Sequence, residues 1–494
     1  MLFDAVGRPP ASNLNQRNGM APRRKGNPPK SKTSSPQLPV LHPHAAGIDI
    51  GAREIYVAVP PDVCVRNVRS FPTFTEDLHA LRDWLQDGGV TTVAMESTGV
   101  YWIPLFQILE AAGIEVCLVN ARHCQNLPGR KTDVQDCQWL QYLHSVGLLR
   151  GSFRPADQVC AVRAILRHRD ALVRGAGRCV SHLHKALTQM NVQLHHVISD
   201  LTGVTGQAIL TAILGGERDP QKLAALKDHR IKASREVIAK SLRGDWRSEH
   251  LFTLRQTHAL WQQHQSLIAE CDAQIEAMLR AFDARVDVAA APLPPPTKTS
   301  HRKAQRNEPQ FAAREECYRV LGVDLTVVPG FQTPTVLVLL CELGPEFAEK
   351  FATAKHFGSW LGLCPDNRIT GGKIYSVRTR DVKSRVAEAL RLAAQSLWQA
   401  KNYFGELYRR WKARLGSPKA ITAMAHKLAR ILWHLLKYKQ PFNPEVFAKE
   451  EEKMKRKKLN RLHNMAASLN YCLCLLYTSP SPRDRTRSRM PSSA

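Results

Sequence analysis

Hydrophobic positions near the start of the chain alternate between short runs typical of strands and longer stretches with helical spacing. Residues 46–51 and 55–59 are apolar runs on either side of a bend near Gly51, which predicts a β-hairpin. Residues 91–96 and 116–119 are two further short apolar runs. Helical spacing fills the intervals, with apolar side chains at Leu78, Leu81, Trp84 and Leu85, and then at Trp102, Leu105, Phe106 and Leu109. This order predicts a mixed α/β sheet covered by helices.

Four acidic residues accompany these elements in positions from which their side chains can converge on one cleft. Asp49 lies inside an apolar strand, and Glu96 ends another strand. Asp133 and Asp136 stand three residues apart at the start of an apolar-periodic segment, where a helix places them on one face. Burying an unpaired carboxylate is costly, and two carboxylates on one face repel each other unless a cation or a proton lies between them.

Together the four acids predict a metal site. Hard cations such as Mg²⁺ prefer oxygen ligands and keep several waters, so a carboxylate quartet suits one or two of them. Two ions about 3.5–4 Å apart stabilise the attacking and leaving oxygens of a phosphodiester displacement. Taken singly, each acid has an ordinary interpretation as a cap or a solvated charge, and Asp133 is a candidate N-cap of its helix. Arg130 and Lys131 lie just upstream, where they would attract a phosphate.

The order of these motifs resembles a known family. GIDIG, MESTGVYW and KTDVQD contain the four acids, and in this order they resemble the DEDD transposases of the insertion-sequence family one-hundred-ten. The resemblance continues through TVVPGFQTPTVLVLLCELG and WLGLCPDNRITGGK, and it covers roughly residues 45–440. It implies a RuvC-like N-terminal domain of RNase H fold and an enzyme that excises and inserts a mobile DNA element. Family members that are understood use a structured non-coding bridge RNA to choose donor and target DNA, so DNA and a guide RNA are the implied partners.

The charge balance also indicates a polyanionic partner. Lys and Arg number 70 against 43 for Asp and Glu, a net charge of +27, which suits nucleic acid or an anionic membrane surface. No run of about 18 apolar residues is present for a membrane span, and the N-terminus lacks an export pattern. The 12 cysteines form no CxxC pair and fit reduced core residues. We therefore expect a cytoplasmic, nucleoid-associated protein without a membrane partner.

A helical region begins at about Pro155. Basic residues recur there at steps of four and seven and therefore share one helix face, at Arg163, Arg167, Arg174, Arg178 and Lys185. A solvated face is one interpretation, and a surface that follows the phosphates of RNA or DNA is the other. A seven-residue repeat of apolar positions from Leu254 to Phe282 favours a helical hairpin or an oligomer-forming coiled coil. The family's coiled-coil domain sits at this place, and paired-site recombination calls for a homodimer or homotetramer.

The candidate nucleophile lies in the distal part of the chain. Thr370 precedes two glycines, and the basic residues close behind are Lys373, Arg378 and Arg380. Glycines permit close approach of the backbone to a phosphate, and cations offset the charge that develops on it. In the family a serine here is the nucleophile and becomes linked to the 5′ end of cleaved DNA. The matching residue is Thr370, whose added methyl stiffens χ1 and crowds attack at phosphorus. Ser376 is a neighbouring hydroxyl, although its spacing from the glycines differs.

Composition divides the chain into segments, and the resemblance assigns the fold of the middle ones. The fold class is an α/β RNase H/RuvC-like domain, a helical coiled-coil middle and a mainly helical C-terminal transposase domain with a helix-hairpin-helix-like element at Pro329–Gly330. The alternative for that element is an ordinary turn before a core helix. The expected boundaries are a disordered basic extension (1–44), the RuvC-like domain (45–154), the coiled-coil domain (155–285), a Pro-rich basic linker (286–310), the transposase domain (311–445) and a disordered or non-native basic tail (446–494).

Two other functions remain open at this stage. A structure-specific endonuclease that cuts four-way junctions would need only the carboxylates and an activated water, and would leave no protein–DNA adduct. A catalytically inactive relic, in which threonine has replaced the family serine, would bind nucleic acid with a steep salt dependence and cut nothing. The four acids together with the hydroxyl at Thr370 favour the transposase, with Mg²⁺ as its cofactor.

Overall fold

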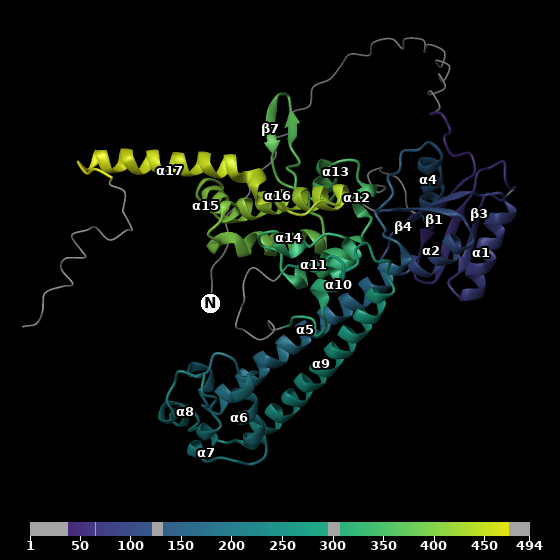
Figure 1. Ribbon diagram of the computed structural model, residues 1–494. Coiled ribbons are helices and arrows are strands. Elements are labelled where there is room, and N and C mark those ends of the chain that lie inside the picture. The colour runs from purple at the N-terminus through teal and green to yellow at the C-terminus, as the bar shows by residue number, and fades with distance from the viewer. Residues whose placement is uncertain (1–37, 65, 121–131, 295–306, 474–494) are drawn as a thin grey trace, which may run out of the picture. The chain divides into compact units, whose positions relative to one another are not determined.

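The computed structural model describes residues 38–64, 66–120, 132–294 and 307–473 (Figure 1). The chain divides into two compact units, one that ends at Arg154 and one that begins at Pro155. The first unit is a mixed α/β domain and the second is mostly helical, which confirms the fold class predicted from the sequence. No helix in the described ranges is long and apolar enough to cross a membrane.

The N-terminal unit is built on a five-stranded sheet of order β3-β2-β1-β4-β5. The strands are β1 (Ala45–Ile50), β2 (Glu54–Ala58), β3 (Val68–Pro72), β4 (Thr92–Glu96) and β5 (Glu115–Val119). The first three pair antiparallel, whereas β4 and β5 run parallel to β1. The apolar runs of the sequence predict four of these strands. They do not predict β3, because only Phe71 of its five side chains is buried.

Helices cover both faces of this sheet. On one face, Ile48 and Met95 pack with the leucines of α1 (Thr75–Asp87) and α2 (Trp102–Ala111) in the main core of the unit. On the other face lies α4 (Asp133–Ser145), which approaches β1 so closely that a Cβ on Gly47 would lie 2.3 Å from the carbonyl oxygen of Cys137. The absence of a side chain at Gly47 therefore allows α4 to lie directly on the sheet.

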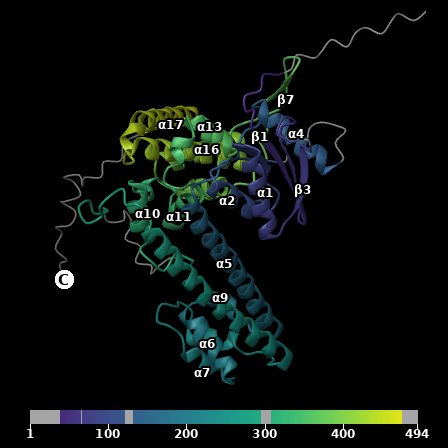
Figure 2. The ribbon, with the colours of Figure 1, turned by 90° about the vertical axis from the view of Figure 1, so that its right-hand side faces the viewer.

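The C-terminal unit begins with two long helices, α5 (Asp157–Gln189) and α9 (Ser248–Arg280), which run side by side in the views of Figures 1 and 2. Their contact buries Ile268, one of the seven-residue apolar positions, against Leu172 and Ala176. The chain between them folds into a small helical core at one end of the pair. Its elements are η1 (Leu194–His196), α6 (Val204–Leu214), α7 (Pro220–Ala225) and α8 (Arg235–Ser241). The repeat therefore forms an intramolecular helical hairpin.

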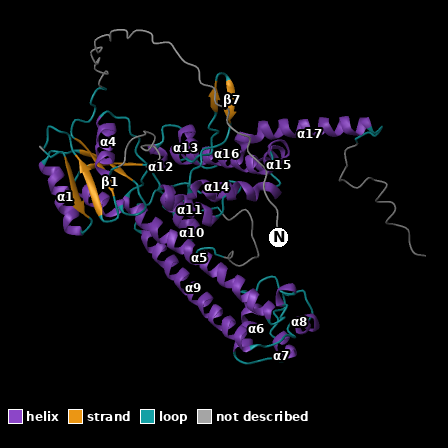
Figure 3. Ribbon diagram, turned by 180° about the vertical axis from the view of Figure 1, so that it is seen from behind, coloured by secondary structure: helices purple, strands orange, loops and turns teal. Residues whose placement is uncertain are grey.

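The rest of this unit is a helical body from which one small hairpin projects, as Figure 3 shows. The body contains α10 (Ala313–Leu321), η2 (Leu325–Val327), α11 (Thr333–Leu343), α12 (Phe347–Lys350), α13 (Ala354–Trp360), α14 (Arg385–Ser396), η3 (Leu397–Gln399), α15 (Tyr403–Leu415) and α16 (Ser417–Tyr438). The hairpin consists of β6 (Arg368–Thr370) and β7 (Lys373–Ser376), and it lies between α13 and α14 in the sequence. At Gly330, φ is +94° and a Cβ would lie 2.7 Å from the carbonyl oxygen of Ala393, so the Pro329–Gly330 turn packs on α14.

The C-terminal segment differs from its expected disorder. After η4 (Pro444–Phe447), residues of the basic tail form α17 (Ala448–Ser468). Helix formation there has a local cause, because Lys and Glu are strong helix formers and Glu451 pairs with Lys455 one turn later at 3.2 Å. The ring of Phe447 anchors the start of the helix by stacking on Tyr403. Residues 1–37 and 474–494, also expected to be disordered, lie outside the described residues.

Candidate active site

The acids of the N-terminal unit that belong to strands point to the same face of the sheet. Side chains alternate along a strand, so Asp49 shares the face of Gly47, against which α4 packs. Likewise Glu96 shares the face of Thr92, whose hydroxyl lies 2.9 Å from Nε2 of His144 in α4. Strands β1 and β4 are adjacent and parallel, and Ile48 lies opposite Met95. Asp49 and Glu96 are the next residues on the two strands, so they lie at the same level of the sheet.

The other two acids open the helix that covers this face. Thr132 is the N-cap of α4, and its hydroxyl accepts a hydrogen bond from the backbone N–H of Gln135 at 3.3 Å. Asp133 is therefore the first helical residue, and the ordinary interpretation of it as the N-cap does not hold. Asp133 is exposed, whereas Asp136 is partly buried. The positive end of the helix dipole favours both carboxylates at this end.

The electrostatics of the cluster link all four acids. The pKa of Asp49 is raised to about 6, first by burial and then by the negative charges of Glu96, Asp133 and Asp136. Burial also raises the pKa of the Cys137 thiol to about 12, and the charge of Asp49 adds to that rise. The carboxylates of Glu96, Asp133 and Asp136 are therefore close enough to Asp49 to repel its negative charge. This repulsion favours either a proton on Asp49 or a cation among the four acids.

The donor set fits a divalent ion. All four groups are carboxylates, the ligand type that hard cations select, and Mg²⁺ is often held by only one or two carboxylates with water and substrate phosphate completing its shell. Within the part of the chain that the structure describes, no three His, Cys, Asp or Glu side chains lie close enough together to hold an ion by themselves. The observation that supports a cation is the raised pKa of Asp49, which is caused first by burial and then by the negative charges of the other three acids.

Two of the predicted phosphate-binding residues cannot be placed. Arg130 and Lys131 precede α4 in the segment 121–131, which lies outside the described residues. Their proposed contact with a phosphate beside the acids remains a prediction.

Thr370 lies at the tip of the β6–β7 hairpin, in the C-terminal unit. Its backbone pairs with that of Lys373, and Gly371 and Gly372 form the two-residue turn between them. Their φ values are +56° and +76°, the left-handed conformation that a tight hairpin turn requires at both central positions. No heavy atom lies within 4 Å of a Cβ built on either glycine, so the space around the turn is open. The hydroxyl of Thr370 is thus presented on an exposed, accessible tip.

The cations that follow Thr370 have different surroundings. Lys373 is exposed beside Thr370. The backbone carbonyl of Arg378 accepts a hydrogen bond from the backbone N–H of Asp366 at 2.8 Å. The backbone N–H of Arg378 donates to the hydroxyl of Ser376 at 3.3 Å. The guanidinium of Arg380 donates to the backbone oxygen and hydroxyl of Ser359, and so braces the base of the hairpin.

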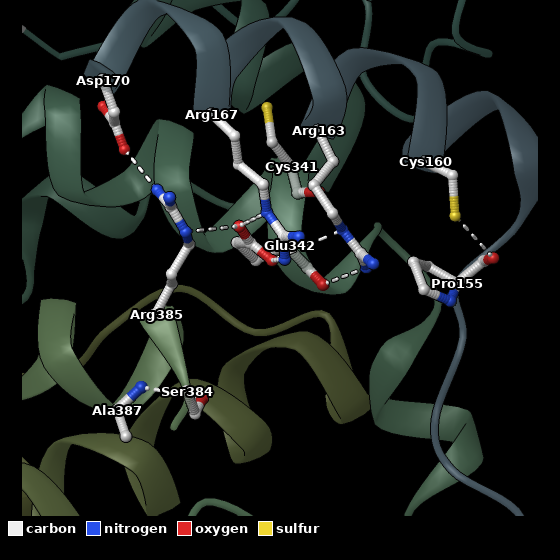
Figure 4. Close-up of polar contacts among 10 residues, drawn as sticks. All are labelled: Pro155, Cys160, Arg163, Arg167, Asp170, Cys341, Glu342, Ser384, Arg385 and Ala387. Atoms are coloured by element: carbon white, nitrogen blue, oxygen red, sulfur yellow. Dashed lines mark hydrogen bonds and ion pairs between the residues drawn. The ribbon is translucent and has the colours of Figure 1, made fainter. Parts of the chain in front are cut away.

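The predicted basic face of α5 divides into two parts. Arg167 forms a bidentate pair with Glu342 of α11 at 2.7 and 2.8 Å, and Arg163 donates to the backbone oxygen of Glu342 at 2.7 Å (Figure 4). Arg385, the first residue of α14, approaches the same carboxylate and donates to Asp170 at 2.7 Å. These three arginines join α5, α11 and α14. Arg174, Arg178 and Lys185 lie farther along the predicted face and are exposed, and the side chain of Arg167 is itself 46% exposed despite its pair with Glu342.

Glu342 is a residue that the sequence interpretation missed. Its side chain is 7% exposed and holds several arginines, yet it lies within the apolar run of α11. The signal for it was present, because an acid inside an apolar run is the pattern that identified Asp49. The sequence interpretation also missed the buried ion pair between Arg169 and Asp272, which joins α5 to α9.

Comparison with known families assigns both regions that hold the candidate residues. Residues 46–192 match the DEDD transposase family of IS110 elements, and residues 324–409 match the Transposase IS116/IS110/IS902 family. No curated protein matches the chain significantly. The first region contains the four acids, and the second contains the hairpin with Thr370.

Proposed function

This chain belongs to the IS110-type DEDD transposases, and from that premise we propose that its acid cluster and its Thr370 hydroxyl together cut and rejoin DNA. The protein is a DNA transposase, and domains of the DEDD class depend on divalent metal ions. The observation that supports the proposal is the electrostatic interaction of Asp49 with Glu96, Asp133 and Asp136 at one face of the sheet. The metal that suits these oxygen ligands is Mg²⁺.

In this mechanism the four carboxylates would hold Mg²⁺ together with water and the scissile phosphate, and so orient that phosphate. The bound ion would neutralise charge on the phosphate and on the leaving oxygen. The hydroxyl of Thr370 attacks phosphorus, so that a bond forms from its oxygen to the 5′ phosphate of the DNA and a 3′ hydroxyl leaves. Lys373, paired with Thr370 in the hairpin, offsets the negative charge that develops. A 3′ hydroxyl from a second strand then attacks the linkage and releases Thr370.

The partners follow from the charge of the chain and the family. A non-coding guide RNA would select the DNA sites. The exposed cations Arg174, Arg178 and Lys185 on α5 provide a surface for its phosphates or those of DNA. Exchange between two DNA sites requires two active sites, so the working form is a homodimer or homotetramer. The enzyme acts in the cytoplasm at the nucleoid.

Strand exchange on supercoiled DNA tests the proposal. The assay contains the element ends, a target, the flanking non-coding RNA and Mg²⁺, and denaturing gels detect the covalent protein–DNA adduct. We expect Asp49→Ala and Thr370→Ala to abolish both exchange and the adduct. Glu76→Ala, an exposed acid in the first turn of α1, and Ser376→Ala, the other hairpin hydroxyl, serve as matched controls that keep activity.

The outcomes separate this mechanism from the alternatives. Cutting that persists in Thr370→Ala without an adduct would identify a nuclease with water as its nucleophile. Loss of the adduct in Ser376→Ala alone would transfer the nucleophile to Ser376. Binding without cutting in the unsubstituted protein would identify the inactive relic.

A further inference from the structure

The β6–β7 hairpin carries a cluster of exposed apolar side chains beside the candidate nucleophile. Tyr375 is 83% exposed, the highest value among the large apolar side chains of the described residues. Ile369, Ile374 and Val377 are also exposed, at 61%, 66% and 54%. Single exposed apolar residues are common on protein surfaces, but a contiguous group on one short hairpin is typical of a binding surface.

The position of Tyr375 in the hairpin is irregular. Ile374 pairs with Ile369, and Ser376 pairs with Arg368, so Tyr375 is an extra residue with no partner on β6. Such a bulge redirects a side chain and often lies next to an active site. Paired residues lie about 5 Å apart and a strand advances about 3.3 Å per residue, which puts the Cα of Tyr375 roughly 8 Å from that of Thr370.

The surrounding charges indicate which partner would cover this ring. Arg368 and Lys373 are exposed on the same hairpin. Cations interleaved with an aromatic ring are typical of surfaces that bind single-stranded nucleic acid, and the net charge of +27 favours the same partner. A ring can stack only on a base that is not already stacked between its neighbours, so the strand must be unpaired at this position.

We propose that Tyr375 stacks on an unpaired base of the DNA strand to be cut, and thereby holds the neighbouring phosphate against Thr370. This inference rests on the proposed function, because that function puts DNA at the hairpin tip. Tyr375 is then a substrate-binding residue that contacts a base, and Lys373 supplies the positive charge that attracts the phosphates. Strand separation at the cut site exposes the base that the ring receives.

Binding to short oligonucleotides tests the proposal in the full-length protein. The Thr370→Ala background and omission of metal prevent cutting, so the result is independent of whether Thr370 is the nucleophile. Fluorescence anisotropy compares single-stranded DNA, the same sequence as a duplex, and the same sequence as RNA. A 2-aminopurine base in the DNA strand reports stacking through loss of its fluorescence.

We expect Tyr375→Leu to weaken single-stranded DNA binding by about 5- to 150-fold and to abolish the 2-aminopurine quenching, with duplex binding little changed. Tyr375→Phe and Tyr375→Trp keep the ring and should retain both. The matched control is Tyr471→Leu, which removes a different tyrosine that is 73% exposed in the same unit. Lys373→Gln should lower the salt dependence of binding by about 0.7 in slope, whereas Tyr375→Leu should leave the slope unchanged.

Three results would overturn the proposal. These are binding by Tyr375→Leu that equals the unsubstituted protein, an equal loss on duplex DNA, or a loss confined to RNA. If Thr370→Ala keeps strand exchange while the Tyr375 effect persists, the proposed nucleophile is wrong and the stacking contact stands.

Discussion

The acid cluster and the Thr370 hairpin contain the two sets of candidate catalytic residues, and they are built in opposite ways. Asp49 and Glu96 extend from strands whose other face is the main hydrophobic core, and α4 lies directly on Gly47. Thr370 lies on an exposed two-stranded hairpin. A Cβ added to either glycine of its turn would have no neighbouring heavy atom within 4 Å. The acids are fixed by packing, whereas the hydroxyl is presented to its surroundings.

This difference fits the two roles proposed for these regions, a cation site and a nucleophile. A cation site needs its ligands in place before the ion arrives, because holding like charges together costs free energy that only a rigid scaffold can support. A nucleophile that must reach a DNA phosphate gains from an open approach. The consequence is that an added side chain should disturb the packing of the acid region, whereas it finds free space at the hairpin turn.

Among changes that leave the candidate catalytic side chains in place, the largest expected effect comes from one methyl group at Gly47. In Gly47→Ala the new Cβ would lie 2.2 Å from the backbone nitrogen of Gln141, so α4 must move away from β1. Overpacking of this kind costs about 1–3 kcal/mol, and displacement of catalytic groups by about 1 Å lowers activity about 100-fold. Strand-exchange rates and thermal unfolding of the full chain measure the two effects.

The matched variant in the hairpin is Gly371→Asn. Asparagine tolerates the left-handed conformation and Asn-Gly is a favoured hairpin turn, so exchange should stay near that of the unsubstituted protein. If Gly371→Asn proves as damaging as Gly47→Ala, the turn is as constrained as the sheet and the contrast between the regions is lost.

The next effect concerns the methyl group of Thr370. In Thr370→Ser the hydroxyl remains, χ1 is less restricted and the approach to phosphorus is less crowded. We expect adduct formation to become severalfold faster, measured as a single-turnover rate on denaturing gels. A slower rate in Thr370→Ser would mean that the methyl contributes to the positioning of the hydroxyl.

The sequence predicts that the four acids come together, and it does so for a physical reason. Apolar runs mark buried strands, and Asp49 inside such a run has few stable environments other than a charged or protonated cluster. Parallel pairing then brings Asp49 and Glu96 to the same level, and the three-residue spacing places Asp133 and Asp136 together. The apolar runs and the three-residue spacing are local patterns, whereas the pairing of β1 with β4 joins segments far apart in the sequence.

Other features depend on contacts that no local pattern contains. Arg163 and Arg167 have the same four-residue spacing as Arg174 and Arg178, yet the first pair meets Glu342, 175 residues away from Arg167. Similarly, the bulge at Tyr375 arises from the register between β6 and β7. Spacing places the cations on one face, but the fold decides which of them face another helix.

Lowering the pH should affect the acid cluster and leave the Thr370 hairpin unchanged. The pKa of Asp49 is about 6, so below that pH its carboxylate is protonated and unable to bind a cation. At limiting Mg²⁺, activity should fall about tenfold for each pH unit below 6. Above pH 6 the ionisation of Asp49 should cause no further change in activity. Calorimetry in two buffers should detect proton release on Mg²⁺ binding at pH 6.

The control for this titration is Thr370→Ala, in which the hairpin hydroxyl is lost and the acids remain. Its proton release should equal that of the unsubstituted protein, whereas Asp49→Asn should release less. Proton release that disappears in Thr370→Ala would mean that the metal site requires the hairpin.

The smallest effect is a gain of stability when Asp49 loses its charge. The pKa of Asp49 in the folded protein, about 6, lies above its ordinary value of 3.8, so ionised Asp49 destabilises the folded state above pH 6. This cost in free energy decreases as the pH falls from 6 to 3.8. Because the carboxylate is partly exposed and screened, we expect metal-free Asp49→Asn to be more stable by about 1 kcal/mol at pH 7.5, with the difference lost near pH 4. Hydrogen exchange of β1 and β4 in the full chain measures it. Loss of stability at pH 7.5 would mean that Asp49 is held by favourable contacts, and the acids would then need no cation to offset them.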